Sequence, residues 1–332
     1  MHIDYSKDSL PSKNLSKLDD LFADFLLRSR SQNTRDAYKR DLKHFFNFLR
    51  AVGGFRGLRD VSQRHIARYR DTMSEVELLS NTTVARRLSS VKRFFDFLME
   101  REICVKNPVQ GVSRPKIPLQ VKTNDLSNEE VREMMSHIKQ HNKNGSHNYS
   151  GVLHHTVLTV MFHVLLRKSE VLNLNFEDYT SDNVGTYLHV TSKGGRKEKV
   201  YISEHVAGVI DRYLEIFSKR FEFSSLDALF TAGVNVGHIK RLNRNSIDLI
   251  FKKYSKLAGI THKVSPHSSR ATGIGNMYEH GASLEDQATY ARHSDPRMTF
   301  QYNKRRKEKL GHISSIVTYE LPEEESSIEQ PS

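Results

Sequence analysis

The chain has few of the features that mark secreted, disulfide-bonded or membrane-spanning proteins. Its 332 residues include a single cysteine, Cys104, and no tryptophan. One cysteine excludes an internal disulfide, and a Cys/His zinc site of the usual spacing is missing. The sequence has no run of about twenty apolar residues, which a membrane span needs, and its first residues lack the apolar stretch of a secretory signal. We therefore expect a protein of the reducing cytoplasm with no membrane partner.

Acidic residues are also scarce relative to basic ones. The chain has 51 Lys and Arg against 39 Asp and Glu, which gives a formal net charge of +12 and a pI near 9.6. Basic residues exceed acidic ones both in residues 1–110 and in the rest, whereas the last residues are rich in glutamate and indicate an acidic disordered tail. Two basic halves favour a nucleic-acid partner that is gripped from two sides.

The first third of the chain shows the periodicity of helices. Apolar residues that recur every three or four positions predict four helices, over residues 18–30, 34–49, 63–73 and 81–98. The fourth helix is basic on the side opposite its apolar stripe, at Arg86, Arg87, Lys92 and Arg93. Such a face is often only solvated, but it can also lie along a phosphate backbone, so these four residues are our candidate DNA contacts.

A change in composition separates this helical part from the rest. Three prolines and little periodicity indicate a linker over residues 107–123, and Ser127 with Glu130 forms a capping box that begins a new domain. An alternating pattern over 187–191, a Lys-Gly-Gly turn and a return over 199–202 predict a β-hairpin. The remaining apolar patterns predict helices over residues 152–166, 203–220, 246–258, 267–280 and 284–291.

The expected fold is therefore mostly α with a small β-sheet in the second domain, an α+β arrangement. The predicted organisation is an N-terminal extension (1–17), a four-helix domain (18–106), a linker (107–123), a larger domain with the sheet (124–319) and the acidic tail (320–332). No repeat of 20 to 50 residues is visible, which excludes solenoids and propellers.

Four separated segments of the second domain carry cationic or nucleophilic side chains. They are Leu166-Arg167-Lys168-Ser169-Glu170, Ser192-Lys193-Gly194-Gly195, Pro266-His267-Ser268-Ser269-Arg270, and the stretch from His293 to Tyr302. Each has an ordinary interpretation by itself, such as an arginine that faces a helix dipole or a lysine that decorates a turn. His267 and Arg270, however, stand three positions apart on a new helix, so both can point at one ligand.

Taken together and in this order, the four segments resemble the tyrosine recombinase (phage integrase) family. That family carries a Leu-Arg-x-Ser-Glu segment, a hairpin lysine beside glycine, a His-x-x-Arg, and a histidine nine residues before the nucleophilic tyrosine; here Tyr302 follows His293 by nine positions. The resemblance covers the whole chain and implies an N-terminal DNA-binding domain and an integrase-type catalytic domain. We expect the two-domain type without an arm-binding domain, because about seventeen residues precede the first predicted helix.

The resemblance implies a role for each residue. The implied roles are clamping of the scissile phosphate by Arg167 and Arg270, phosphate contact by His293, proton transfer by Lys193 and His267, attack by Tyr302, and support of the first arginine by Glu170. Guanidiniums suit a phosphodiester because they are planar, always charged and bidentate. A phenol with a pKa of about 10 needs a strongly positive site and a base to become a nucleophile, and a lysine of lowered pKa can protonate the leaving oxygen.

The implied reaction is site-specific recombination of double-stranded DNA at inverted-repeat core sites. The tyrosine would form a 3′-phosphotyrosyl link, and four protomers on two DNA sites would exchange strands through a Holliday junction, for integration, excision or resolution of a DNA element. Accessory recombination proteins are further candidate partners. Because the covalent link keeps the energy of the broken bond, we expect no ATP. Because the arginines and the lysine supply the positive charge and the proton, and no clustered Asp/Glu metal motif is visible, we expect no metal or other cofactor.

The chain departs from the family pattern at three places. The family commonly has Gly-Leu-Arg, His-x-Leu-Arg and Leu-Gly-His where this chain has Leu165-Leu166-Arg167, His267-Ser268-Ser269-Arg270 and Ala291-Arg292-His293. No catalytic group is lost, so we expect activity. Two alternatives stay open: a catalytically impaired, sequence-specific DNA-binding relative in which the changes at Ser269 and Arg292 accompany lost activity, and a relaxing topoisomerase of similar chemistry.

Overall fold

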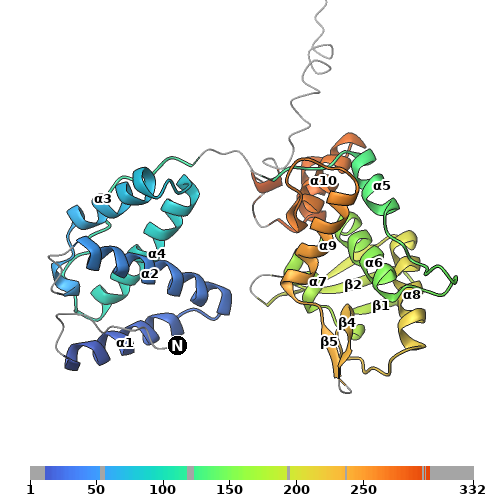
Figure 1. The fold of residues 1–332 in the computed structure, drawn as a ribbon, viewed down its shortest axis with the longest axis horizontal. Coiled ribbons are helices and arrows are strands. Elements are labelled where there is room, and N and C mark those ends of the chain that lie inside the picture. Colours follow the sequence, from blue (N-terminus) through green and yellow to red (C-terminus); the bar gives the residue numbers. More distant parts are fainter. Residues whose placement is uncertain are drawn as a thin grey trace, which may run out of the picture. The chain divides into compact units, whose positions relative to one another are not determined.

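The chain divides into two compact units, residues 1–118 and 119–332 (Figure 1). The structure is a computed structural model, and it describes residues 12–52, 57–117, 123–192, 195–235, 238–293, 295 and 297–299. Over these residues no helix combines the length and the hydropathy that a membrane span requires. Each unit has its own apolar core, so each is described by itself.

The described part of the N-terminal unit is helical. It contains α1 (Ser12–Leu27), α2 (Gln32–Val52), α3 (Gln63–Asp71) and α4 (Asn81–Glu100), with the short turns η1 (Leu58–Asp60) and η2 (Thr72–Val76) between them. Their apolar faces meet in a core rich in aromatic rings, including Phe25, Phe45, Phe94 and Phe95. The four predicted helices are confirmed, although the first begins and ends earlier than expected.

The C-terminal unit mixes helices with two small antiparallel sheets. Its helices are α5 (Asn128–Ser136), α6 (Tyr149–His163), α7 (Lys168–Asn173), α8 (Glu204–Ser218), α9 (Arg244–Leu257), α10 (Pro266–Glu279) and α11 (Leu284–Tyr290). One sheet has the order β1 (Tyr179–Asp182), β2 (Gly185–Thr191), β3 (Lys197–Ile202), and the other pairs β4 (Thr231–Asn235) with β5 (His238–Arg241). A short turn, η3 (Phe176–Asp178), precedes β1. The expected α+β fold is confirmed.

Helix α6 lies at the centre of the C-terminal unit. Its apolar residues are spread around the whole helix, and ten of its fifteen residues are buried. It packs against α7, α8 and α10, so the segment that follows its end is held between elements on several sides. This central position is what brings the first arginine segment next to α10 and the residues after α11.

The local signals of the sequence place most element boundaries. The capping box is present: the Ser127 hydroxyl accepts the Glu130 N–H at 3.1 Å, and the Glu130 carboxylate accepts the Ser127 N–H at 2.9 Å. The predicted helix over 152–166 ends earlier, at His163, because Leu165 takes a positive φ of 54°. Helix α7, strand β1 and the β4–β5 hairpin are elements that the sequence patterns did not predict.

Candidate active site

Three segments far apart in the sequence meet at the end of α6. The Arg167 guanidinium donates to the backbone carbonyl of Arg292 at 2.9 Å. The Arg270 guanidinium, from the first turns of α10, donates to the carbonyls of Leu165 and Ala291. These bonds tie the loop between α6 and α7 to α10 and to the residues after α11, and they bring both predicted arginines into one cluster.

Arg167 is positioned by the carboxylate three residues after it. Its guanidinium bonds Glu170 Oε1 at 2.6 Å, and its backbone N–H bonds Glu170 Oε2 at 2.7 Å, so the pair forms the cap of α7. The Glu170 side chain is 2% exposed and that of Arg167 is 31% exposed. Burial alone would raise the pKa of Glu170, but the Arg292 guanidinium and the bonds from Arg167 hold that pKa below its ordinary value. The supporting carboxylate is therefore ionised.

Arg270 is the largest fully buried side chain among the described residues. A buried guanidinium must have its N–H groups satisfied, and here the carbonyls of Leu165 and Ala291 accept from it. Carbonyl oxygens position a guanidinium without cancelling its charge. Arg270 therefore adds a fixed positive charge to the cluster.

The two predicted histidines lie in the field of these cations. Burial, the positive charges of Arg270, Arg167 and Arg292, and the ionisable ring of His267 lower the pKa of His293 from 6.5 to about 4. Partial desolvation and the charges of Arg270 and Arg167 also lower the pKa of His267. His293 is thus neutral near pH 7, and its Nδ1 lies 2.7 Å from the Thr299 hydroxyl oxygen, which orients the ring.

Arg292 has a backbone conformation that explains why glycine suits this position. Its φ is 54°, in the left-handed region that side chains with a Cβ disfavour. Its side chain folds inward, is 8% exposed, and bonds the carboxylate of Glu170 at 3.2 Å. The Arg292 guanidinium therefore lies inside the cluster and holds the carboxylate of Glu170 in place.

Ser269 and Leu165 are the other two departures, and both are accommodated by local contacts. The Ser269 side chain is buried, and its hydroxyl donates to the Pro266 carbonyl at 2.8 Å, so no polar group is left unpaired. Leu165 has the same φ of 54° as Arg292. Its side chain packs on Gly273 of α10, where a Cβ would lie 2.0 Å from Leu165 Cδ2.

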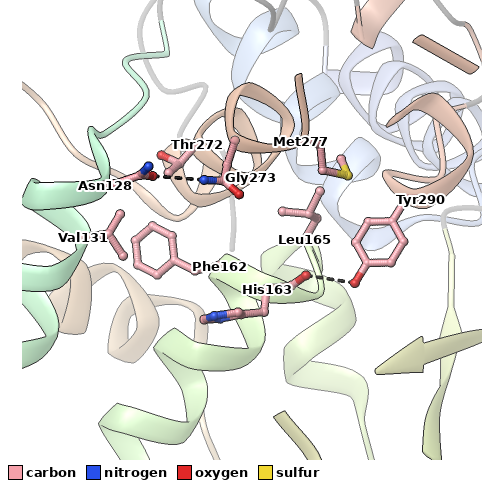
Figure 2. A pocket seen from close by; sticks show the side chains of 10 residues that line it. Asn128, Val131, Phe162, His163, Leu165, Thr272, Gly273, Met277 and Tyr290 are labelled. Carbon is pink, nitrogen blue, oxygen red and sulfur yellow. Dashed lines mark hydrogen bonds between the residues drawn. The ribbon is translucent and has the colours of Figure 1, made fainter. Parts of the chain in front are cut away.

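An apolar pocket of about 240 Å³ adjoins this packing contact (Figure 2). It is lined by side chains from α5, α6, α10 and α11, among them Phe162 and Met277, and by Leu165 from the loop after α6. The Tyr290 hydroxyl donates to the His163 carbonyl at 2.9 Å at its edge, and burial raises the pKa of Tyr290. A phenol that is bonded and harder to ionise is a poor nucleophile, which leaves Tyr302 as the better candidate.

Two predicted catalytic residues, Tyr302 and Lys193, lie outside the described residues. The described ends of the hairpin around Lys193 are closed by a bond from the Ser192 N–H to the Arg196 carbonyl at 2.8 Å. In the part of the chain that the structure describes, no group of three or more His, Cys, Asp or Glu side chains is arranged to hold a metal ion.

The predicted DNA-binding residues of α4 have different surroundings. Arg86 forms an ion pair with the buried carboxylate of Asp41, which also accepts from the Ser90 hydroxyl. Arg87 faces Glu77 at 3.6 Å with 18% of its side chain exposed, and Lys92 pairs with Asp96 at 2.8 Å. Arg86 and Arg87 thus contact acidic groups of their own unit.

Arg93 lines a hollow of about 710 Å³ on the N-terminal unit. The hollow is also lined by Arg28 and Arg114, two basic residues that the sequence patterns did not single out. The Arg114 guanidinium donates to the Ser89 hydroxyl at 3.3 Å, one helical turn from Arg93. The sequence offered no pattern that would have singled out Arg114, which lies within the predicted linker.

Sequence comparisons relate the chain to proteins of one family. The sequence profile described as the phage integrase family matches residues 124–309, and the profile of the phage integrase N-terminal SAM-like domain matches residues 20–102. A tyrosine recombinase of Pseudothermotoga lettingae is 26% identical over 285 residues, which cover 85% of this chain and 91% of that protein. Tyrosine recombinase XerD of Shewanella oneidensis is 26% identical over 281 residues, with 83% and 88% covered.

Solved structures with the same fold come from recombinases bound to DNA. XerH site-specific recombinase on a palindromic difH substrate superposes with a TM-score of 0.69 at 16% identity, covering 91% of this chain and 84% of that one. A lambda integrase (residues 75–356) dimer bound to a COC′ core site gives a TM-score of 0.67 at 15% identity, with 88% and 95% covered. At these identities the likeness concerns the fold of the chain.

Proposed function

The chain belongs to the phage integrase family, and we propose that it is a tyrosine-type site-specific recombinase that cuts and rejoins double-stranded DNA. One observation carries the proposal: three separate segments bring Arg167, His267, Arg270 and His293 into one cluster. Hydrogen bonds join the two arginines to the backbone just before His293, and the arginine charges lower the pKa of both histidines. Burial of the Arg270 cation beside two further guanidiniums is unfavourable for folding, because the like charges repel one another. The arrangement therefore indicates a site that binds an anion. A bound phosphodiester supplies the missing negative charge.

The Arg167 and Arg270 guanidiniums stabilise the charge that develops at phosphorus, within a cluster whose net charge is positive. Arg167, Arg270 and Arg292 carry three positive charges against the single carboxylate of Glu170, which leaves the described cluster positive. A phosphodiester gains negative charge on its non-bridging oxygens as the attacking oxygen approaches. Donors that are already positioned act without reorganisation at that moment, and removal of one typically lowers the rate by 10²- to 10³-fold.

The two histidines act as neutral groups near pH 7. His293, with a pKa of about 4, offers a hydrogen bond to a phosphate oxygen or to the attacking phenol without adding a charge. His267 keeps an exposed edge beside Arg270, and its lowered pKa keeps the ring neutral near pH 7, the form that is able to accept a proton. A neutral imidazole can take the phenolic proton, which an imidazolium cannot.

Tyr302 supplies the nucleophile in this mechanism. Its phenolic oxygen forms a bond to phosphorus as the bond from phosphorus to the 5′-oxygen breaks, and Lys193 donates the proton that the leaving 5′-oxygen needs. The product is a 3′-phosphotyrosyl link with a free 5′-hydroxyl. Attack by a 5′-hydroxyl of another strand reverses the step, so rejoining consumes no ATP.

The partners follow from this chemistry. The substrate is double-stranded DNA with inverted-repeat core sites, and four copies of the chain on two sites exchange strands through a Holliday junction, with accessory recombination proteins as further partners. Two relatives in fold support this assembly: XerH was solved on a palindromic difH substrate, and lambda integrase was solved as a tetramer bound to a Holliday junction. We place this DNA-acting enzyme in the cytoplasm.

A nicked suicide substrate tests the proposal. The 5′-hydroxyl fragment diffuses away after cleavage, so the covalent protein–DNA product accumulates and can be measured on a denaturing gel. We expect wild type to form this product without metal or ATP and Tyr302→Phe to form none. If wild type binds the same DNA tightly but forms no product, the chain is the DNA-binding relative instead. Resolution of a synthetic Holliday junction, as opposed to mere relaxation of supercoils, excludes the topoisomerase.

A further inference from the structure

We propose that Arg292 is a positioning residue for strand transfer, whose guanidinium joins the segments that carry Arg167 and Arg270 to the segment that carries His293. This inference rests on the proposed function. Arg292 is not one of the groups assigned to bind the phosphate or to move a proton. Its contribution is to fix the groups that do.

The backbone at Arg292 is strained, and its surroundings hold it there. The φ of 54° lies in the left-handed region, which glycine adopts readily and arginine does not. Strain of this kind persists where the surrounding contacts over-determine the conformation, and it clusters at functional sites. In the described chain Leu165, in the facing segment, has the same conformation, so both segments that meet here are strained.

The side chain of Arg292 shares an acceptor with each of the two predicted phosphate clamps. One guanidinium nitrogen, Nη2, bonds the Leu165 carbonyl at 3.1 Å, the same carbonyl that accepts from Arg270. It also bonds Glu170 Oε2 at 3.2 Å, on the carboxylate that holds Arg167. The other nitrogen, Nη1, bonds the Tyr290 carbonyl at 3.0 Å. Removing this side chain therefore loosens the supports of both clamps at once.

The backbone of Arg292 also connects Arg167 with His293. Its carbonyl accepts from the Arg167 guanidinium at 2.9 Å, and the next residue along the chain is His293. A shift of this one residue is thus transmitted to Arg167 through a hydrogen bond and to His293 through the chain. Displacement of a reacting group by about 1 Å can lower a rate by about 10²-fold.

Arg292 also contributes charge to the cluster. With Arg270, Arg167 and His267 it is one of the positive or ionisable groups that lower the pKa of His293, and it holds the pKa of Glu170 below its ordinary value. Its side chain is 8% exposed, so solvent screens this charge little. A lysine at this position would keep the charge but lose the fork that reaches two acceptors.

Two substitutions separate positioning from simple relief of strain. Arg292→Gly removes the side chain and suits the backbone conformation, and Arg292→Lys keeps the charge and the strain. Glu102→Gly is the matched control, because Glu102 is exposed in the N-terminal unit and has a φ of 57°. For each variant we would measure the melting temperature, the DNA dissociation constant, and the single-turnover rate constant of suicide-substrate cleavage at saturating protein over a range of pH.

We expect Arg292→Gly to lower the cleavage rate constant by about 10- to 100-fold with a dissociation constant within about twofold of wild type, because supporting contacts act on the rate. The cleavage rate constant of Arg292→Lys should lie between those of Arg292→Gly and wild type, and Glu102→Gly should cleave like wild type. We also expect Arg292→Gly, but not Arg292→Lys, to raise the pKa of His293, which proton NMR reports without any cleavage.

Results that contradict the inference about Arg292 differ from those that contradict the proposed function. If Arg292→Gly melts as high as wild type and cleaves at the wild-type rate at every pH, Arg292 only fills space and the inference is wrong. If Arg292→Gly does not fold, an unchanged rate constant in Arg292→Lys overturns the inference equally well. A wild-type chain that forms no covalent product contradicts the proposed function, and the NMR comparison then still decides whether Arg292 contributes to lowering the pKa of His293.

Discussion

Leu165 packs against Gly273 so closely that a Cβ at position 273 would force the leucine side chain to move. A Cβ built there would lie 2.0 Å from Leu165 Cδ2 and 3.2 Å from the Phe162 carbonyl oxygen. Leu165 itself has a φ of 54°, and its carbonyl accepts from Arg270 and Arg292. The glycine in α10 thus allows the strained leucine to sit where two cations need its carbonyl.

Gly273→Ala is expected to destabilise the C-terminal unit by about 1 to 3 kcal/mol, although alanine favours a helix more than glycine does. The double variant Leu165→Ala/Gly273→Ala removes the clashing methyl groups, and it should lose less stability than the two single changes added together. Urea unfolding of all four proteins measures this coupling. Additive losses would show that the two residues do not contact each other in solution.

Glu170→Gln should be far more costly than loss of an exposed ion pair. The change leaves Arg167 and the buried Arg292 without their shared counter-charge, and we expect a loss of about 3 kcal/mol together with slower cleavage. The matched control is Asp248→Asn, which breaks the half-exposed ion pair with Lys168. Lys168 lies in α7, like Glu170, and the change should lower the free energy of unfolding by less than about 1 kcal/mol. Equal losses in urea unfolding would argue against a buried, ionised Glu170.

Acidification should destabilise the C-terminal unit between about pH 6.5 and pH 4. His154 and His293 both have pKa values lowered to about 4, the first mainly by burial and then by Lys253. In this range the unfolded chain binds more protons than the folded one, so the free energy of unfolding falls as the pH falls. Urea unfolding at pH 7 and pH 5 measures the loss. His154→Gln should lose less stability over this range than wild type, and an identical loss would remove His154 as a cause.

The basic residues of α4 should separate into two groups. Arg93→Ala is expected to weaken DNA binding and to reduce the salt dependence of the logarithm of the binding constant by about one unit, without changing the unfolding midpoint. Arg86→Ala should instead destabilise the N-terminal unit, because it leaves the Asp41 carboxylate buried without its cation. Salt titrations and urea unfolding distinguish the two effects. A stable Arg86→Ala with a reduced salt slope would make Arg86 a direct DNA contact.

Local signals in the sequence were enough to predict much of the fold. The Ser127–Glu130 capping box and the hairpin of β2 and β3 depend on residues a few positions apart, and both are present in the structure. The end of α6 was misplaced because neither glycine nor proline marks it: a leucine adopts the left-handed conformation, and its side chain packs on Gly273. A contact between residues about a hundred positions apart leaves no local pattern in the sequence from which it could be predicted.

The candidate site shows the same limit. The types and order of Arg167, His267, Arg270 and His293 resemble the pattern of the phage integrase family, and this resemblance nominated them; such groups also suit the chemistry of a phosphodiester. The inward fold of Arg292 was not predictable, since its acceptors on Leu165 and Glu170 lie more than 120 positions away. The structure places this arginine inside the cluster.

The most direct test of the account is the identity of the amino acid that becomes attached to DNA. After cleavage of the nicked substrate, nuclease and trypsin digestion followed by mass spectrometry identifies the peptide that carries the nucleotide. We predict that the modified residue is Tyr302, linked to a 3′-phosphate, in the peptide between Arg297 and Lys304. Attachment at another residue, or a link to the 5′ end of the strand, would contradict the account.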